Sequence, residues 1–164
     1  MSRKTHSTRR GFLAVGAATL ACPASAAGYQ VLTGAEADLL DAICDQIVPA
    51  DRDAGAKQAG CVQYIDRQLA GPLQRYKNAY RQGLAALVKT IDFLHLGFDE
   101  RKAFLRRMEA GEISGPAWEP VSAATFFNMV LDHTYQGFYG DPKHGGNRDA
   151  VSWHMLGIAE HMHG

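Results

Sequence analysis

Residues 33–49, TGAEADLLDAICDQIVP, contain the start, the apolar face and the end of one helix. At the start, the Thr33 hydroxyl can accept a hydrogen bond from the Glu36 amide while the Glu36 side chain reaches back, which is a capping box. Behind it, apolar residues recur at helical spacing: Leu39, Leu40, Ile43 and Ile47. Pro49 stops the pattern. The segment predicts an amphipathic helix with one buried face.

The same spacing recurs along the rest of the chain. Four further apolar stripes are predicted as helices over residues 62–69, 73–91, 99–111 and 122–137. Gly83 lies inside the second of these and weakens it by about 1 kcal/mol relative to alanine. No run alternates with a period of two for long enough to predict a strand. We therefore expect an all-α fold of about five helices, forming a single domain over residues 28–164.

The first 27 residues are excluded from this domain because they have the pattern of an export signal. Thr8-Arg9-Arg10-Gly11-Phe12-Leu13 leads into an uncharged stretch that ends in Ala24-Ser25-Ala26, a small-residue cleavage site. Arg9 and Arg10, followed by Phe12 and Leu13, indicate the twin-arginine route, which carries folded proteins. We expect cleavage of residues 1–27 and a periplasmic location. A lipoprotein modified at Cys22 and a retained anchor are the alternatives.

The charge of the remaining chain excludes one class of partner. Residues 1–27 hold four of the 17 basic residues and none of the 17 acidic ones, so 13 bases face 17 acids after cleavage, a net charge of −4. Such a chain lacks the basic surface that nucleic-acid binding requires. One local basic face is predicted on the helix over 99–111, at Arg101, Lys102, Arg106 and Arg107. We interpret it as a solvated face, with docking of an acidic partner as the alternative.

Two cysteines remain after cleavage. Cys44 and Cys61 are 17 residues apart, each near the end of a predicted helix. A disulfide between them would persist in the periplasm. Two buried thiols that pack as small apolar side chains are the alternative, and the sequence leaves both open.

Residues 137–149, GFYGDPKHGGNRD, match neither a helix nor a strand. Their glycines, proline and turn-capping Asp and Asn specify a fixed irregular path. Aromatic residues and an arginine are typical of a contact surface and not of a linker. We predict an irregular, Gly-rich C-terminal arm that docks another subunit through Phe138, Tyr139, Asp141, Pro142, Gly145, Gly146, Asn147, Arg148, Asp149 and Trp153. Arg148 is the expected polar anchor.

Two alternatives remain for this arm. It could merely pack on its own helices. It could also be a catalytic loop that uses His144, Asp141 or Asp149 as acid or base, although no nucleophile or second catalytic partner is evident beside them. A phosphate-binding loop is disfavoured because neither glycine pattern of such loops is present.

Together with the leader, three motifs resemble the gluconate 2-dehydrogenase subunit 3 family. They are Ile43–Asp51, Gly55–Leu69, and Gly137–Asp149 with Trp153 and Met155. Members are small, cofactor-free subunits of membrane-associated, flavin-dependent dehydrogenases of sugars and sugar acids. His144 departs from the pattern, since an aromatic residue is common at this position.

The resemblance implies a division of labour. FAD would belong to a large flavoprotein subunit, and a cytochrome c subunit with haem c would accept the electrons. This chain would then hold no catalytic, cofactor-binding or metal-binding residue. Its leader would export the flavoprotein together with itself. The substrate would be decided by the large subunit.

Two other functions stay open. His154, Met155, His161, Met162 and His163 are side chains of the kind that bind copper or zinc, so a periplasmic copper-handling protein is the main alternative. We expect no metal site there, because two imidazoles at a chain end lack a fixed third ligand. A free-standing small helical enzyme is the remaining alternative.

Overall fold

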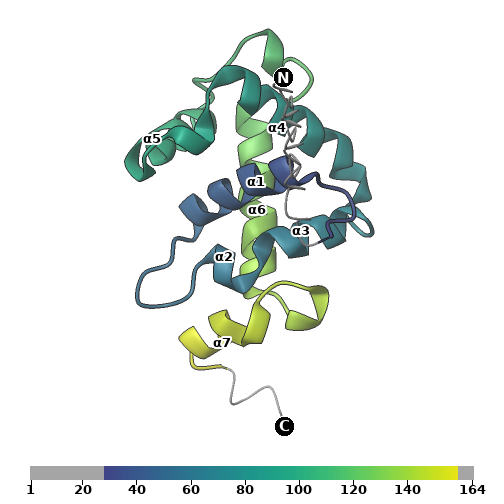
Figure 1. The fold of residues 1–164 in the computed structure, drawn as a ribbon, viewed down its shortest axis with the longest axis vertical. Helices are drawn as coiled ribbons and strands as arrows, with labels where there is room; N and C mark the ends of the chain where they lie inside the picture. The colour runs from purple at the N-terminus through teal and green to yellow at the C-terminus, as the bar shows by residue number, and fades with distance from the viewer. Residues whose placement is uncertain (1–27, 159–164) are drawn as a thin grey trace, which may run out of the picture.

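The computed structural model describes residues 28–158. All the regular secondary structure in this range is helical (Figure 1). The predicted leader, with Arg9, Arg10, Phe12, Leu13 and Cys22, lies outside the described residues, as do His161, Met162 and His163. The α-helices are α1 (Gly34–Ile47), α2 (Ala56–Ala59), α3 (Cys61–Leu69), α4 (Lys77–Thr90), α5 (Phe98–Glu109), α6 (Ala123–Tyr139) and α7 (Val151–Met155). Short 3-10 turns join them: η1 (Gln74–Tyr76), η2 (Phe93–His95), η3 (Pro116–Trp118), η4 (Pro142–His144) and η5 (Arg148–Ala150).

The helix starts predicted at Thr33 and Ser122 are confirmed, whereas the helix predicted from residue 73 begins at Lys77, after the 3-10 turn η1. The Thr33 hydroxyl accepts from the Glu36 amide at 3.2 Å, and the Glu36 carboxylate accepts from the Thr33 amide at 2.8 Å. Ser122 caps α6 by accepting from the amide of Thr125 at 3.1 Å. The five long helices are the five expected. The sequence analysis missed α2 and α7, which have four and five residues and are too short to show an apolar period.

Helix α6 forms the centre of the fold. It runs along the long axis of the molecule, and α1, α3, α4 and α5 pack against it (Figure 1). Its fully buried residues include Phe126, Val130 and Phe138. Where α4 crosses it, Gly83 is buried so closely against Phe126 that a β-carbon would overlap the ring. Gly83 is therefore required by packing, a role that its helix-weakening effect does not reveal.

A buried carboxylate fixes the beginning of the described chain. Asp66 on α3 is 4% exposed and accepts hydrogen bonds from the backbone amides of Gln30, Val31 and Leu32 at 2.7, 2.9 and 2.9 Å. Charge-assisted bonds of this kind are roughly twice as strong as neutral ones. The segment that follows the predicted cleavage site is thereby tied onto α3.

Cys44 and Cys61 are both buried free thiols in this structure, which is the arrangement of the thiol alternative. The Cys44 sulfur lies 3.2 Å from the Thr134 hydroxyl oxygen, and the Cys61 thiol donates to the Thr134 carbonyl at 3.6 Å. Burial raises the pKa of Cys44 to about 12 and also raises the pKa of Cys61. The two thiols therefore behave as small core side chains.

In the described part of the chain, none of the helices combines the length and the apolar character needed to cross a membrane.

A candidate docking site at the C-terminal arm

The C-terminal arm, residues 140–158, lies at one end of the molecule, where η5 packs against α2 and α7 packs against α6 (Figure 1). The structure corrects the expected course of residues 137–149. Helix α6 continues to Tyr139, and η4 and η5 give the following residues local helical turns. The helix passes through Gly137 because its bare backbone packs on Tyr64, with an added β-carbon falling 2.9 Å from that ring. This packing offsets the cost of about 1 kcal/mol of a helical glycine.

Asn147 holds the arm in place. Its backbone amide donates to the Gly137 carbonyl at 2.7 Å, and its side-chain amide donates to the Gly140 carbonyl at 2.9 Å. Its side-chain oxygen accepts from the amide of Ser152 at 3.0 Å, at the start of α7. Asn147 is fully buried. One residue, through its backbone amide and its side chain, thus connects the end of α6, the turn after it and α7.

The backbone around Asn147 is strained. Asn147, Asp149 and Ala150 have positive φ angles of 43°, 56° and 52°. Asparagine and aspartate tolerate this left-handed region, whereas for alanine it is uncommon, and such residues cost of order 1–3 kcal/mol each. The surrounding contacts must therefore define this conformation strongly. The arm is a built surface and not a linker.

The predicted docking residues fall into two groups. Phe138, Gly146 and Asn147 are buried within the chain, so in this structure they shape the arm and present no side chain to a partner. A β-carbon at Gly146 would overlap the Gly137 carbonyl, which explains the glycine. The remaining residues are exposed or half-buried, and for them a docking role stays a prediction: Tyr139, Asp141, Pro142, Gly145, Arg148, Asp149 and Trp153.

Several of these side chains are fixed by neighbours. The indole of Trp153 donates to the Tyr139 carbonyl at 3.0 Å. Lys143 lies 2.7 Å from the Asp141 carboxylate and donates to it from its amide at 3.0 Å, which lowers the pKa of Asp141. The Arg148 guanidinium lies against the left-handed Gly60, where a β-carbon would come 3.1 Å from it.

Three apolar residues that the sequence analysis did not predict as docking residues lie on the same arm. Met155, Leu156 and Ile158 are 38%, 54% and 40% exposed. The predicted docking residue Tyr139, at the end of α6 beside the arm, is 44% exposed. Together with Arg148 and Trp153 they give the arm the mixture of aromatic, methionine and arginine side chains that is enriched at protein interfaces. Exposed apolar side chains indicate a contact surface, and the sequence alone does not show which apolar residues are exposed.

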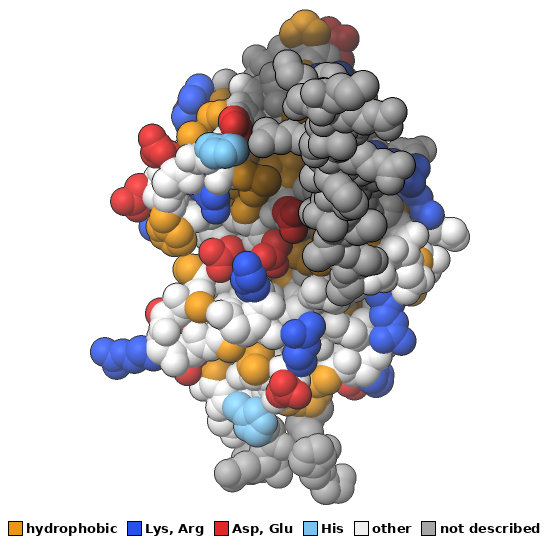
Figure 2. Space-filling view, in the orientation of Figure 1, with side chains coloured by type: hydrophobic (Ala, Val, Ile, Leu, Met, Phe, Trp, Pro, Cys, Tyr) orange, Lys and Arg blue, Asp and Glu red, His pale blue; other side chains and the backbone are white. Residues whose placement is uncertain are grey.

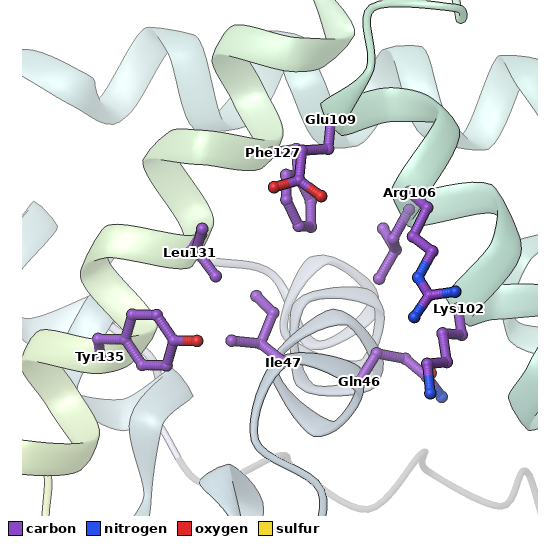
Figure 3. A pocket seen from close by; sticks show the side chains of 9 residues that line it. Gln46, Ile47, Lys102, Arg106, Glu109, Phe127, Leu131 and Tyr135 are labelled. Atoms are coloured by element: carbon purple, nitrogen blue, oxygen red, sulfur yellow. The ribbon is translucent and has the colours of Figure 1, made fainter.

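A second concave surface lies away from the arm. A cleft of about 260 Å³ lies between α5 and α6. The C-terminal end of α1 also projects into it (Figure 3). Its residues are Gln46, Ile47, Lys102, Leu105, Arg106, Glu109, Phe127, Leu131 and Tyr135. None of them was selected as a site from the sequence, although Lys102 and Arg106 belong to the predicted basic face.

His144, Asp141 and Asp149, the residues considered for a catalytic loop, all lie on the arm surface, with His144 and Asp149 exposed. Over residues 28–158, no three His, Cys, Asp or Glu side chains gather as metal ligands would. His154 and Met155 lie on α7 and are exposed. The rest of the terminal His and Met residues lie outside the described range.

The family model of gluconate 2-dehydrogenase subunit 3 matches residues 34–159, from the first residue of α1 to beyond α7. The chain belongs to the gluconate 2-dehydrogenase subunit 3 family. The match includes the arm as well as the helical body, so the arm is part of the family's domain. Membership indicates a role as a subunit beside a larger dehydrogenase. No curated protein and no solved structure matches the chain.

Proposed function

We propose that this chain is the non-catalytic small subunit of a membrane-associated, FAD-dependent dehydrogenase of a sugar or sugar acid. It binds the flavoprotein subunit through the C-terminal arm and exports it by the twin-arginine route. The observation that carries the proposal is the strained arm that Asn147 fixes within the matched family domain. A fold retains strain of this kind where the surface it creates has a use.

The arm supports docking through its side chains. Arg148 is exposed, and its planar guanidinium can bind a partner carboxylate or backbone carbonyls at two points. The Tyr139 ring packs edge-on against Phe138, and the Trp153 indole is held by its hydrogen bond to the Tyr139 carbonyl, so binding through these two aromatic surfaces costs little side-chain entropy. Arginine, tyrosine and tryptophan are the residues that most often dominate binding energy at interfaces.

The leader supports the export half of the proposal. Arg9 and Arg10 are predicted to direct a folded passenger across the membrane, and a flavoprotein must bind FAD before it crosses. A partner that binds only the folded flavoprotein also stabilises it by mass action. The proposed complex places FAD in the large subunit and haem c in a cytochrome c subunit.

The test is co-purification of the flavoprotein from the periplasm of cells that express both chains. We expect Arg148→Ala to reduce the captured FAD about tenfold, corresponding to about 1.4 kcal/mol. Gly145→Val should act similarly, since Gly145 has φ +98° and a β-carbon there would lie 3.2 Å from the Arg67 side chain. The matched control is Arg52→Ala, an exposed loop arginine on a different segment.

Two results would overturn the proposal. One is a flavoprotein that reaches the periplasm in normal amount when Arg9 and Arg10 are both replaced by lysine. The other is oxidation of gluconate or a related sugar acid by this chain purified alone. Equal capture by the Arg148→Ala, Gly145→Val and wild-type chains would remove the arm from the interface.

A further inference from the structure

The four basic residues of α5 fall into two groups, which differ in whether their charged ends have a partner within the chain. The Arg101 guanidinium donates to the carbonyls of Phe93 and Leu94, and Arg107 forms an ion pair with Glu112 at 3.5 Å. Lys102 and Arg106 are exposed at the cleft and pair with no carboxylate among residues 28–158. Lys102 and Arg106 are one helical turn apart, so their side chains lie next to each other. Together they give one side of the cleft a positive charge.

Gln46 gives a second and independent signal in the same cleft. Both its amide nitrogen and its amide oxygen are buried, and neither has a hydrogen-bond partner among the described residues. Leaving such a group unpaired costs about 1–3 kcal/mol. In Figure 3 its side chain reaches toward Lys102 from the end of α1. A primary amide offers an NH2 donor group and a carbonyl acceptor side by side, which complement the carbonyl and N–H of an extended peptide.

The third feature is apolar. Phe127 and Leu131 of α6 and Ile47 of α1 form the opposite side of the cleft, with Tyr135 at its edge (Figure 3). The volume of about 260 Å³ is below the roughly 300–1,000 Å³ of small-molecule sites. Glu109 is the one carboxylate in the lining, so the two cations still outnumber it.

We propose that this cleft binds an extended acidic segment of the flavoprotein. Its carboxylates pair with Lys102 and Arg106 and draw the exposed Lys102 side chain away from the buried Gln46 amide, so that a peptide group can pair with that amide. An apolar side chain of the segment covers Phe127 and Leu131. The proposal rests on the proposed function for the identity of the partner. It adds a second contact surface, which is distinct in sequence and in chemistry from the arm.

The two terminal segments of this chain contain almost no acidic residues, so we expect the acidic segment to come from another protein. Residues 1–27 contain four basic residues and no acidic one, so the leader offers no carboxylate for Lys102 and Arg106. Residues 159–164 contain a single acidic residue, Glu160. An apolar groove alone would accept many occupants, but unpaired cations beside an unpaired amide select an acidic peptide.

The first test compares two charge reversals in full-length chains co-expressed with the flavoprotein. K102E/R106E should lower the captured flavoprotein at least about tenfold, and the wild-type capture should weaken as salt is raised. The control R81E/K89E changes the net charge by the same amount at exposed positions of α4 outside the cleft and should stay within about twofold of wild type. Equal capture by the two double variants overturns the proposal.

The second test separates binding from folding. Gln46→Met keeps a side chain of similar length but removes the two unpaired polar atoms, so it should raise the melting temperature while lowering capture. A fall in both would assign Gln46 a structural role and count against the proposal. Failure of the wild-type chain to capture any flavoprotein would instead overturn the proposed function, so the two failures are distinguishable.

The third test identifies the occupant. A benzoylphenylalanine introduced at Tyr135, which is 43% exposed at the cleft edge, should cross-link on irradiation to a flavoprotein peptide that carries aspartate or glutamate. Cross-linking to a second copy of this chain, to its own leader, or to a peptide without acidic residues would each contradict the proposal.

Discussion

Phe126, Val130 and Phe138 hold the helical body together by apolar packing along α6, whereas Asn147 holds the arm together by hydrogen bonds. In the body, many buried apolar side chains each contribute a part of the stability, and they recur along the sequence with the period of a helix. In the arm, one asparagine and a few glycines fix a path that includes three non-glycine residues with positive φ. The body should therefore tolerate most surface changes, while the arm should depend on single residues.

The most damaging change should be in the body, at Gly83. Gly83→Ala places a β-carbon into the ring of Phe126, so α4 and α6 must separate. We expect a loss of about 2 kcal/mol in the free energy of unfolding, because overpacking of cores typically costs 1–3 kcal/mol. Helix propensity alone predicts the opposite sign, a gain of about 1 kcal/mol. Urea denaturation followed by far-ultraviolet circular dichroism measures the difference.

Gly71→Ala is the matched control. The nearest atom to a β-carbon at Gly71 is the Arg67 carbonyl oxygen at 3.8 Å, which is ordinary contact. Its effect should stay within about 0.5 kcal/mol. A Gly83→Ala chain that is more stable than wild type would show that α4 and α6 do not approach as closely as described.

The next effect should be confined to the arm. Asn147→Ala leaves the Gly140 carbonyl and the Ser152 amide without their partner and places alanine in the left-handed region. We expect residues 140–158 to lose about 2 kcal/mol of protection against local opening, from unpaired polar groups that each cost about 1–3 kcal/mol. Hydrogen exchange should speed up in the arm while α1 to α5 keep wild-type rates.

Asp149→Gly supplies the comparison within the arm. It relieves a positive φ of 56° without touching the Asn147 bonds, so exchange in the arm should stay unchanged or slow down. If Asn147→Ala speeds exchange across the helical body as much as in the arm, the two regions unfold together and the distinction between them is wrong.

The same difference explains what could be predicted from the sequence. The five long helices follow from apolar spacing and from caps such as Thr33 and Ser122, which are local and periodic signals. The last two residues of α6 could not be foreseen, because a glycine such as Gly137 often ends a helix and here continues it while packing on Tyr64. That contact joins residues 73 positions apart.

The composition of the sequence predicted the arm, but it did not distinguish the residues that are buried within the arm from those that are exposed on it. Phe138 and Asn147 were predicted as docking residues, and both are buried in the structure. An aromatic ring on a Gly-rich loop gives no sign of which side it faces. The cleft on α5 and α6 was harder still, because Gln46 and Lys102 are far apart in sequence and each is ordinary by itself.

The smallest predicted effect is a dependence of body stability on pH, through His133. This histidine is 4% exposed, and its Nδ1 lies 3.0 Å from the Tyr80 hydroxyl oxygen. Burial lowers its pKa, the Asp132 carboxylate opposes that shift, and Arg75 adds to it. Below the ordinary pKa of about 6.5, the unfolded chain therefore takes up a proton that the folded chain refuses. The free energy of unfolding should fall as the pH is lowered from about 7 through this range, and level off below the folded pKa.

His133→Gln isolates this contribution because glutamine keeps a hydrogen-bond acceptor for Tyr80 and does not titrate. The variant should be less stable than wild type at pH 7.5, but its stability should fall less between pH 7 and pH 5. His95→Gln is the control, since His95 is an exposed histidine whose side chain is 84% accessible beside Asp92. If stability depends on pH equally in wild type and in His133→Gln, then His133 binds its proton as readily in the folded chain as in the unfolded chain, and the prediction is wrong.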